Sequence, residues 1–245
     1  MGRPDIVPEW QHVHHARVDP HRRAAALADV ILGSQDGVVA VLGALLGIAA
    51  ASANARLVVA AGLATAFADA ISMAGVAYTS MLAQADVYRS EREREYRHVR
   101  EVPMLEQAEV RDIYARKGFV GPLLDRIVAT IVADPDVWVA VMMTEEHQLR
   151  PIDRRRALRS AVVVGVSTML GALLPVAPFL FFSNVRVAAW ASAIVAGAAL
   201  FALGAYKAHV TLGNRWAAGL EMALIGIVSA LVGWGIGAAF AVASG

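Results

Sequence analysis

The sequence predicts an all-α membrane protein with five transmembrane helices and a small cytoplasmic three-helix domain between the second and the third. The first observation is compositional: 58% of the 245 residues are hydrophobic and 18% are charged, against about 45–50% and 25% in soluble proteins. The second is that the apolar residues gather in five runs, each near the ~20 residues that cross a bilayer. The third is that charge is concentrated in one central stretch. A soluble enzyme, a disordered chain and a fibre are therefore excluded.

The spans follow from the apolar runs in order along the chain. The first two are separated by the short loop 53–56 and form the segment 28–82, and the last three form the segment 160–245. The last three are rich in glycine and alanine. Gly233 and Gly237 have the spacing of small residues that lets two helices approach closely. We expect the spans at 28–52, 57–82, 160–182, 187–207 and 217–243.

The basic residues orient the spans, because lysine and arginine collect on the cytoplasmic side of a membrane. With a cytoplasmic N-terminal tail, 1–27, that side holds about 20 of the 22 lysines and arginines. The opposite side keeps only Arg56 and Arg186, so we expect a cytoplasmic N-terminus. The tail lacks the short apolar core of a signal peptide, and this compact organisation suggests an integral protein of a prokaryotic plasma membrane.

The segment 83–159 offers the only room for a domain in water. Its pattern predicts three helices and no strand. A first helix, "DVYRSEREREYRHVREV", stops at Pro103, and a second, "MLEQAEVRDIYARKGF", is followed by breaks at Gly118 and Gly121. The third is expected to be "PLLDRIVATIVADPDVWVAVMMTEEHQL", which ends before Pro151.

Charge, cysteine content and motifs narrow the chemistry. The formal net charge of +1 leaves no broad basic surface, so nucleic acid is not an expected partner. The chain has no cysteine, so a metal site must use Asp, Glu, His, Met or backbone oxygen. The Walker, GxGxxG, GxSxG and HExxH motifs are absent, which argues against an ATP-driven pump and against an enzyme.

Acidic residues inside the first two spans are the first candidates for chemistry, because a carboxylate at the bilayer centre costs at least ~2.5 kcal/mol. Asp36 lies in the first span, and Asp29 lies two helical turns before it. In the second span Thr65, Asp69 and Met73 follow at intervals of four and form one stripe. Carboxylate oxygen with thioether sulfur suits transition metals better than Mg²⁺ or Ca²⁺. In the alternative interpretation, Asp29 lies in the interface and Asp69 pairs with a polar neighbour.

The cytoplasmic helices carry the second set of candidates. Side chains three or four residues apart share a helical face, and each predicted helix carries such a set of metal-binding types. Packed together, the helices could converge these side chains on divalent ions. The alternative is a solvated charged face, because "EREREYRHVRE" offers many Glu–Arg pairs worth only tenths of a kcal/mol each. The candidates are Glu95, His98, Glu106, Glu109, Met142, Met143 and Glu146.

These residues lie in blocks that resemble the vacuolar iron transporter (VIT) family, which includes fungal vacuolar iron/manganese transporters and nodulin-21-like proteins. The resemblance covers roughly 22–243 and rests on the order and spacing of the blocks as well as on their composition. The blocks are "DVILGSQDGVVAVLGALLGIAAA", "ADAISMAGVAYTS", "EVPMLEQAEVRDIYARKGF", "MMTEEHQL" and "GALLPVAPFLF".

The resemblance implies a homodimer whose ion path runs along the dimer axis between the first two spans of each subunit. It implies that Fe²⁺ or Mn²⁺ is cargo, collected by the cytoplasmic domain and exported in exchange for protons, with no tightly bound cofactor. By position, Asp36 matches the pore aspartate, Met73 the pore methionine and Asp29 an aspartate lower in the first span. The cytoplasmic candidates other than His98 match the residues that collect metal.

Three positions depart from the family pattern. His98 stands where many members have a glutamate, which makes the site less anionic and more sensitive to pH at about 6–7. Thr65 stands where eukaryotic members can carry a glutamate tied to proton handling, and Asp69, one turn on, is a candidate substitute. Ala77 stands in place of a further glutamate. Proton coupling is therefore less secure than metal passage.

The predicted function is secondary export of Fe²⁺, with Mn²⁺ as a second candidate cargo, by proton antiport. Two alternatives stay open. A membrane-attached di-iron ferroxidase needs a Glu-x-x-His motif on each of two helices, and the cytoplasmic domain has one, at Glu95 and His98. A membrane metal sensor would bind ions without conducting them, but it has no need of Asp36 and Asp69 inside its spans.

Overall fold

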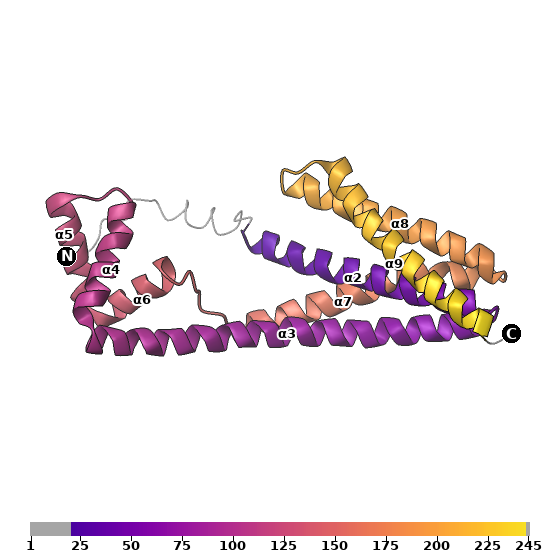
Figure 1. The fold of residues 1–245 in the computed structure, drawn as a ribbon, viewed down its shortest axis with the longest axis horizontal. Coiled ribbons are helices and arrows are strands. Elements are labelled where there is room, and N and C mark those ends of the chain that lie inside the picture. Colours follow the sequence, from indigo (N-terminus) through magenta and orange to yellow (C-terminus); the bar gives the residue numbers. More distant parts are fainter. Residues whose placement is uncertain (1–20, 244–245) are drawn as a thin grey trace, which may run out of the picture. The chain divides into compact units, whose positions relative to one another are not determined.

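The computed structural model describes the backbone of residues 21–243. Residues 1–20 of the expected tail 1–27 therefore lie outside the described part. The described residues form helices and no strand, which confirms the predicted all-α class (Figure 1). The helices are α2 (His21–Ala51), α3 (Ala55–Glu101), α4 (Pro103–Arg116), α5 (Gly121–Val132), α6 (Pro135–Glu145), α7 (Arg154–Phe181), α8 (Val185–Val210) and α9 (Arg215–Ala243).

Five helices, α2, α3, α7, α8 and α9, are long and apolar enough to cross a membrane, as predicted. Helices α5 and α6 together have the length and apolarity of a sixth crossing, but they meet at an angle of 112°. Asp125, Arg126 and Asp136 on this pair are exposed, and charged groups are costly inside a bilayer. We therefore retain five crossings.

The chain divides into two compact units. Unit 1 consists of residues 1–77 and 159–245, and it holds α2, α8 and α9 with the first half of α3 and most of α7. Unit 2 consists of residues 78–158, and it holds the rest of α3 with α4, α5 and α6.

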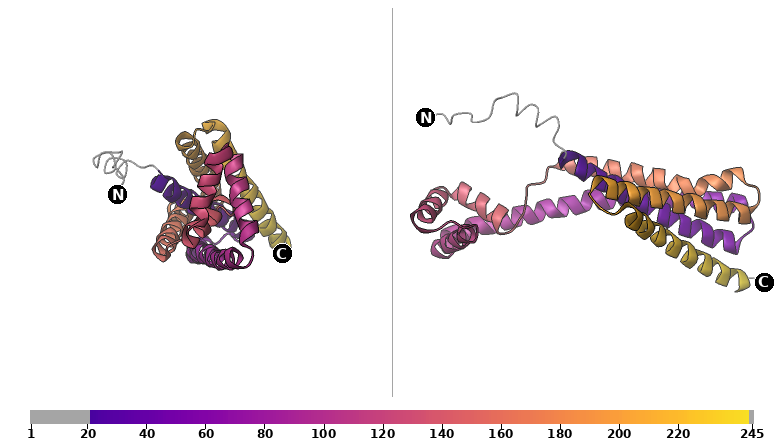
Figure 2. Two further views of the ribbon diagram at one scale, coloured as in Figure 1. Left: turned by 90° about the vertical axis from the view of Figure 1, so that its left-hand side faces the viewer. Right: turned by 90° about the horizontal axis from the view of Figure 1, so that it is seen from above.

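Unit 1 is a bundle of helices that run side by side (Figure 2). Val41 and Leu45 of α2 are fully buried and belong to one apolar cluster with Val176 of α7. Leu42 of α2 and Leu200 of α8 belong to a second cluster on another side of α2. Helix α2 is therefore covered by neighbours on more than one face, which fixes the position of Asp36.

Helix α9 approaches α2 almost backbone to backbone. A methyl group added at Gly237 of α9 would overlap the carbonyl oxygen of Gly47 on α2, and one added at Gly233, one turn earlier, would overlap the carbonyl oxygen of Gly43. The Ser229 hydroxyl of α9 donates a hydrogen bond of 2.9 Å to the carbonyl oxygen of Val39. The close approach predicted for the two small residues of α9 is confirmed.

The helix of the second span continues past the predicted start of the cytoplasmic domain. Helix α3 is one uninterrupted helix of 47 residues, so the expected boundary at residues 82–83 falls inside it. No glycine or proline interrupts this stretch after Gly75, and nothing local therefore ends the helix before the Val102–Pro103 step. The predicted breaks at Gly118 and Gly121 are confirmed, and both glycines have the positive φ that favours this residue, 94° and 58°.

The third helix predicted for this region is wrong, because it is two helices. Helix α5 ends at Val132 and α6 begins at Pro135. Asp134 precedes a proline, which disfavours helical geometry at that residue, and its carboxylate accepts a hydrogen bond of 2.9 Å from the Asp136 N–H. Apolar periodicity on both sides of Asp134 concealed this cap in the sequence.

Unit 2 has its own apolar core, to which all its helices contribute. The C-terminal part of α3, α4, α5 and α6 bring together ten buried side chains with almost no exposed surface. They are Val99, Val110, Ile113, Leu124, Val128, Ile131, Trp138, Val139, Met142 and Met143.

Candidate functional site

Two glutamates of unit 2 are buried almost as completely as its apolar core. Glu95 on α3 is 3% exposed and Glu106 on α4 is 2% exposed. A buried carboxylate is costly unless a partner compensates its charge. One oxygen of each, Oε2, has no hydrogen-bond partner in the described structure. These two side chains therefore define the centre of the candidate site.

Two imidazoles are the basic groups that contact these carboxylates. His98 Nδ1 lies 3.1 Å from Glu106 Oε1 and 3.9 Å from Glu95 Oε1. His147 Nε2 lies 3.0 Å from Glu95 Oε1. Within the described chain, neither glutamate has an ion pair with lysine or arginine. The carboxylates are thus held by groups that are themselves ligands for transition metals.

The turn between α3 and α4 brings His98 and Glu106 together. Val102 donates its N–H to the His98 carbonyl oxygen at 2.8 Å, and α4 starts directly at Pro103. Proline suits the first position of a helix because that position needs no N–H donor. The short reversal therefore places the first turn of α4, with Glu106, against the last turn of α3.

The C-terminus of α6 brings in the fourth and fifth residues. The N–H groups of Glu146 and His147 both donate to the Met142 carbonyl oxygen, at 3.0 and 3.2 Å. Gln148 follows with φ of 54°, a left-handed conformation that is uncommon for residues other than glycine. This turn ends α6 and directs His147 to Glu95.

Two groups of three side chains have the geometry to hold a divalent ion. One is Glu95, His98 and Glu106, and the other is Glu95, Glu146 and His147. In each group the ligand atoms lie within 4.8 Å of one another. Glu95 belongs to both groups, so its carboxylate is common to the two candidate positions.

Burial and mutual repulsion change the protonation of this cluster. Burial raises the pKa of Glu106 to about 7, and the charges of Glu95 and Glu109 act in the same direction. Loss of water also raises the pKa of Glu146, with His147 opposing the shift. Burial alone would lower the pKa of His147, but its hydrogen bond to Glu95 and the negative charges of Glu146, Glu95 and Glu91 together outweigh burial, and the pKa is raised. A cation in the cluster would relieve the repulsion that these shifts express.

The other residues predicted for this site are placed differently. Glu109, half-buried one turn after Glu106, acts on the cluster through its charge. Met142 and Met143 are fully buried in the apolar core of unit 2. Their side chains contribute to that core, and their backbone carbonyls hold the turn that carries His147.

The acidic residues of the spans form a second, smaller group in unit 1. Asp36 on α2 and Asp69 on α3 are neighbours, and Oδ2 of Asp69 is buried without a hydrogen-bond partner in the described structure. Met73 and Asp29 are both half-buried. The Thr65 hydroxyl donates to the Ala61 carbonyl oxygen of its own helix at 2.9 Å, as a threonine inside a helix commonly does.

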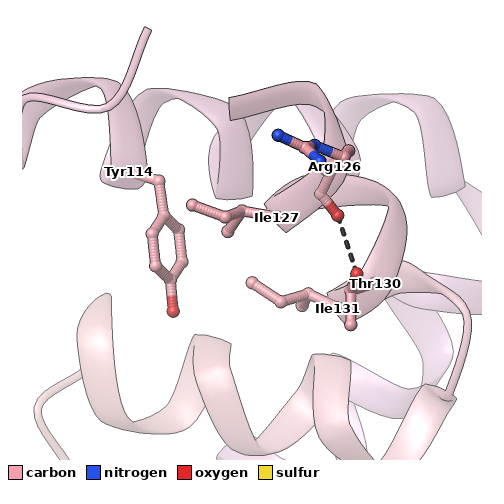
Figure 3. A pocket seen from close by; sticks show the side chains of 5 residues that line it. All are labelled: Tyr114, Arg126, Ile127, Thr130 and Ile131. Carbon is pink, nitrogen blue, oxygen red and sulfur yellow. Dashed lines mark hydrogen bonds between the residues drawn. The ribbon is translucent and has the colours of Figure 1, made fainter. Parts of the chain in front are cut away.

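An open hollow on the surface of unit 2 does not coincide with either group. Its walls are Tyr114, Arg126, Ile127, Thr130 and Ile131 (Figure 3). The Thr130 hydroxyl is used in a hydrogen bond to the Arg126 carbonyl oxygen. The walls are mainly apolar and hold no carboxylate, so the hollow offers little to a cation.

His147 is the one cluster residue that the sequence analysis missed. Helical spacing pairs residues three or four apart, and His147 follows α6 in a turn instead of lying on its face. A histidine next to Glu146 at the end of an apolar helix was the available signal. It cannot be interpreted without knowing that the turn directs the side chain to α3.

Comparison with known proteins agrees with the blocks in the sequence. The model of the VIT family matches residues 27–238. Vacuolar iron transporter 1 of Eucalyptus grandis is 33% identical over 224 residues, which cover 89% of this chain and 90% of the relative. Vacuolar iron transporter 1 of Arabidopsis thaliana is 31% identical over 230 residues, covering 94% and 92%. Protein CCC1 of Saccharomyces cerevisiae is 28% identical over 225 residues, covering 89% and 68%. The chain therefore belongs to the VIT family.

Proposed function

We propose that the protein is a secondary transporter that moves Fe²⁺, with Mn²⁺ as a second cargo, out of the cytoplasm in exchange for protons. The plant relatives named vacuolar iron transporter support iron as the cargo. The observation that carries transport, as opposed to sensing, is the pairing of Asp36 and Asp69 from two different spans. A protein that only anchors a metal-binding domain has no use for two facing carboxyl groups inside apolar helices.

In this proposal unit 2 is the cytoplasmic domain that collects metal before transport. Its carboxylates and imidazoles raise the local concentration of divalent ions. Binding requires deprotonated ligands, so the affinity for metal increases with pH until Glu106 has lost its proton.

The acidic pair of the spans supplies the exchange between metal and proton. Two neighbouring carboxylates repel each other unless a proton or a cation neutralises their charge. A divalent ion that binds between Asp36 and Asp69 competes with protons, because both occupy the same oxygen lone pairs. Asp69 would then take part in proton exchange in place of the glutamate that is absent at position 65. Met73 would add a sulfur ligand that favours transition metals. Asp29 would attract ions to the cytoplasmic end of the path.

A second copy of the chain would complete the path. One chain offers Asp36, Asp69 and Met73, whereas a divalent ion binds about four to six ligands. Two-fold symmetry doubles the set, and two-fold homodimers are the commonest oligomers. Phe67 and Ile71 of α3 are 58% and 72% exposed and would provide apolar surface for this contact or for lipid.

The orientation and the membrane are parts of the same proposal. The distribution of lysine and arginine supports a cytoplasmic N-terminus. The relatives compared are eukaryotic, and those from plants carry the word vacuolar in their names. They lend no support to the predicted prokaryotic plasma membrane.

Transport in liposomes tests the proposal. The purified protein is reconstituted in liposomes that contain a metal-sensitive dye and a pH dye, and Fe²⁺ or Mn²⁺ is added outside. Metal entry with matched proton exit is the expected result. Metal entry without proton movement would leave a carrier but remove antiport. No metal entry, with ions still bound, would favour the sensor, and oxidation of Fe²⁺ by O₂ at unit 2 would favour the ferroxidase.

A further inference from the structure

We infer that His147 is a metal ligand, which with Glu95 and Glu146 forms a second metal position that shares Glu95 with the position made by His98 and Glu106. Each position then has one imidazole nitrogen, and the pair of imidazoles favours Fe²⁺ and Zn²⁺ over Mn²⁺. This inference rests on the proposed role of unit 2 in collecting metal.

The geometry around Glu95 carries the inference. His98 and His147 approach the same oxygen, Oε1, at 3.9 and 3.0 Å. Ligand atoms that surround one ion at about 2.1 Å lie about 3–4 Å apart. Oε2 of Glu95 is buried without a partner, so this carboxylate has an oxygen left for an ion after contacting both imidazoles. A carboxylate in this position can bridge two metal ions.

The charge balance of unit 2 points to cations in the same place. Four of its basic side chains pair with other acids, and in the described structure no lysine or arginine pairs with the cluster, although the C-terminal part of α3 is rich in arginine. The cluster keeps four carboxylates and two imidazoles for itself. The pairs elsewhere are Arg89–Asp86, Arg94–Glu91, Arg111–Asp125 and Lys117–Glu145.

Imidazole nitrogen changes which ion is preferred. Mn²⁺ stands lowest in the general order of affinities, and it is suited by carboxylate, carbonyl and water ligands. Imidazole suits Fe²⁺ and Zn²⁺ better. A position with a histidine ligand should therefore discriminate against Mn²⁺ more strongly than a position made only of carboxylates.

A simpler role for His147 is to orient Glu95 through their hydrogen bond. The two roles predict different results for two substitutions. His147→Gln retains an N–H donor that can reach a carboxylate but removes the imidazole ligand, whereas His147→Ala removes both. His209, exposed and bonded to Arg215 in unit 1, provides the matched control His209→Ala.

The experiment measures binding of Zn²⁺ and of Mn²⁺ separately to the full chain in detergent, by calorimetry. We expect His147→Ala and His147→Gln to lower Zn²⁺ affinity about tenfold or more and to lower Mn²⁺ affinity less. The same samples are treated with diethylpyrocarbonate, and modification of each histidine is followed by mass spectrometry. Zn²⁺ should protect His147 and His98 in the wild type and leave His209 unprotected.

Two results would overturn the inference. One is wild-type Zn²⁺ affinity in His147→Gln, which would assign an orienting role. The other is reactivity of His147 that Zn²⁺ does not change. Glu95→Gln and Glu106→Gln separate this failure from that of the proposed function. If they abolish Zn²⁺ binding and His147→Gln does not, only the inference fails. If they leave binding unchanged, unit 2 does not collect metal.

Discussion

The two groups of acidic side chains in this protein differ in their burial and in the side chains that contact them. In unit 2, Glu95 and Glu106 are almost fully buried and are contacted by two imidazoles at the junction of three helices. In unit 1, Asp36 and Asp69 are half-buried and face each other from two apolar helices. The first group offers an ion many ligands from one chain, and the second offers few.

Ligand number separates sites that hold ions from sites that pass them. A site with many ligands binds tightly and releases slowly, which suits collection. Conduction requires binding that is weak enough for release, and a sparse pair of carboxylates meets that need. The two groups therefore differ in the number and type of their neighbouring ligands as well as in burial.

The largest expected effect is the loss of transport when the pair Asp36 and Asp69 in unit 1 is changed. Asp36→Asn keeps the size of the side chain but removes its charge, so we expect metal entry into liposomes to fall to the rate of protein-free liposomes. Zn²⁺ binding at unit 2 should remain. Asp86→Asn, in which the replaced acid is exposed and paired with Arg89, is the control. Full transport by Asp36→Asn would mean that the carboxylate of Asp36 is not part of the ion path.

The second substitution is in the cluster of unit 2 around Glu95 and Glu106. Glu95→Gln removes the carboxylate shared by both metal positions, so we expect the KM for metal in the same transport assay to rise about tenfold or more. The maximal rate should change less, because the pair in the spans is intact. An unchanged KM would mean that unit 2 does not supply the path.

A third test addresses the close packing of α2 against α7 next to Asp36. A methyl group at Gly37 would overlap the carbonyl oxygen of Thr168 on α7, so Gly37→Ala should destabilise unit 1 by about 1–3 kcal/mol and reduce transport. Thermal unfolding in detergent measures the first effect. Gly235→Ala is the matched control, because nothing lies within 4 Å of an added Cβ there. Zn²⁺ binding at unit 2 should be the same in both.

The smallest expected effect is a pH dependence of the stability of unit 2. Folding raises the pKa of Glu106 from 4.5 to about 7, so the folded state retains a proton that the unfolded state has lost. Metal-free unit 2 should therefore lose stability as pH rises between these values. His147, whose pKa is also raised, acts in the same direction. Hydrogen exchange of peptides from 95–147 at pH 5.5 and 8 measures this, and Glu106→Gln should weaken the dependence.

The spans and the class of fold could be predicted because they depend on local composition. Twenty apolar residues in a row have few alternatives to a membrane helix, and Pro103, Gly118 and Gly121 mark breaks through their own backbone preferences. The Asp134 break was missed, since a capping aspartate inside a continuous apolar pattern changes the direction of the chain without changing its periodicity.

The residues of the candidate site likewise differ in whether local sequence could predict them. Glu95, His98 and Glu106 could be found because helical spacing and a family resemblance both point to them. His147 could not, since its contact with Glu95 joins residues 52 positions apart through a turn with a left-handed residue. The structure also places Met142 and Met143 in the apolar core, a role that side-chain chemistry alone does not distinguish from metal binding.

The backbone contact between α2 and α9 has a mechanical consequence. Where Gly47 and Gly237 meet, the two backbones are in direct contact, so moving either helix across the other disturbs main-chain packing and not only side chains. The hydrogen bond from Ser229 adds a tie at a second level. Displacement of α3 would change the separation of Asp36 and Asp69 without disturbing either contact.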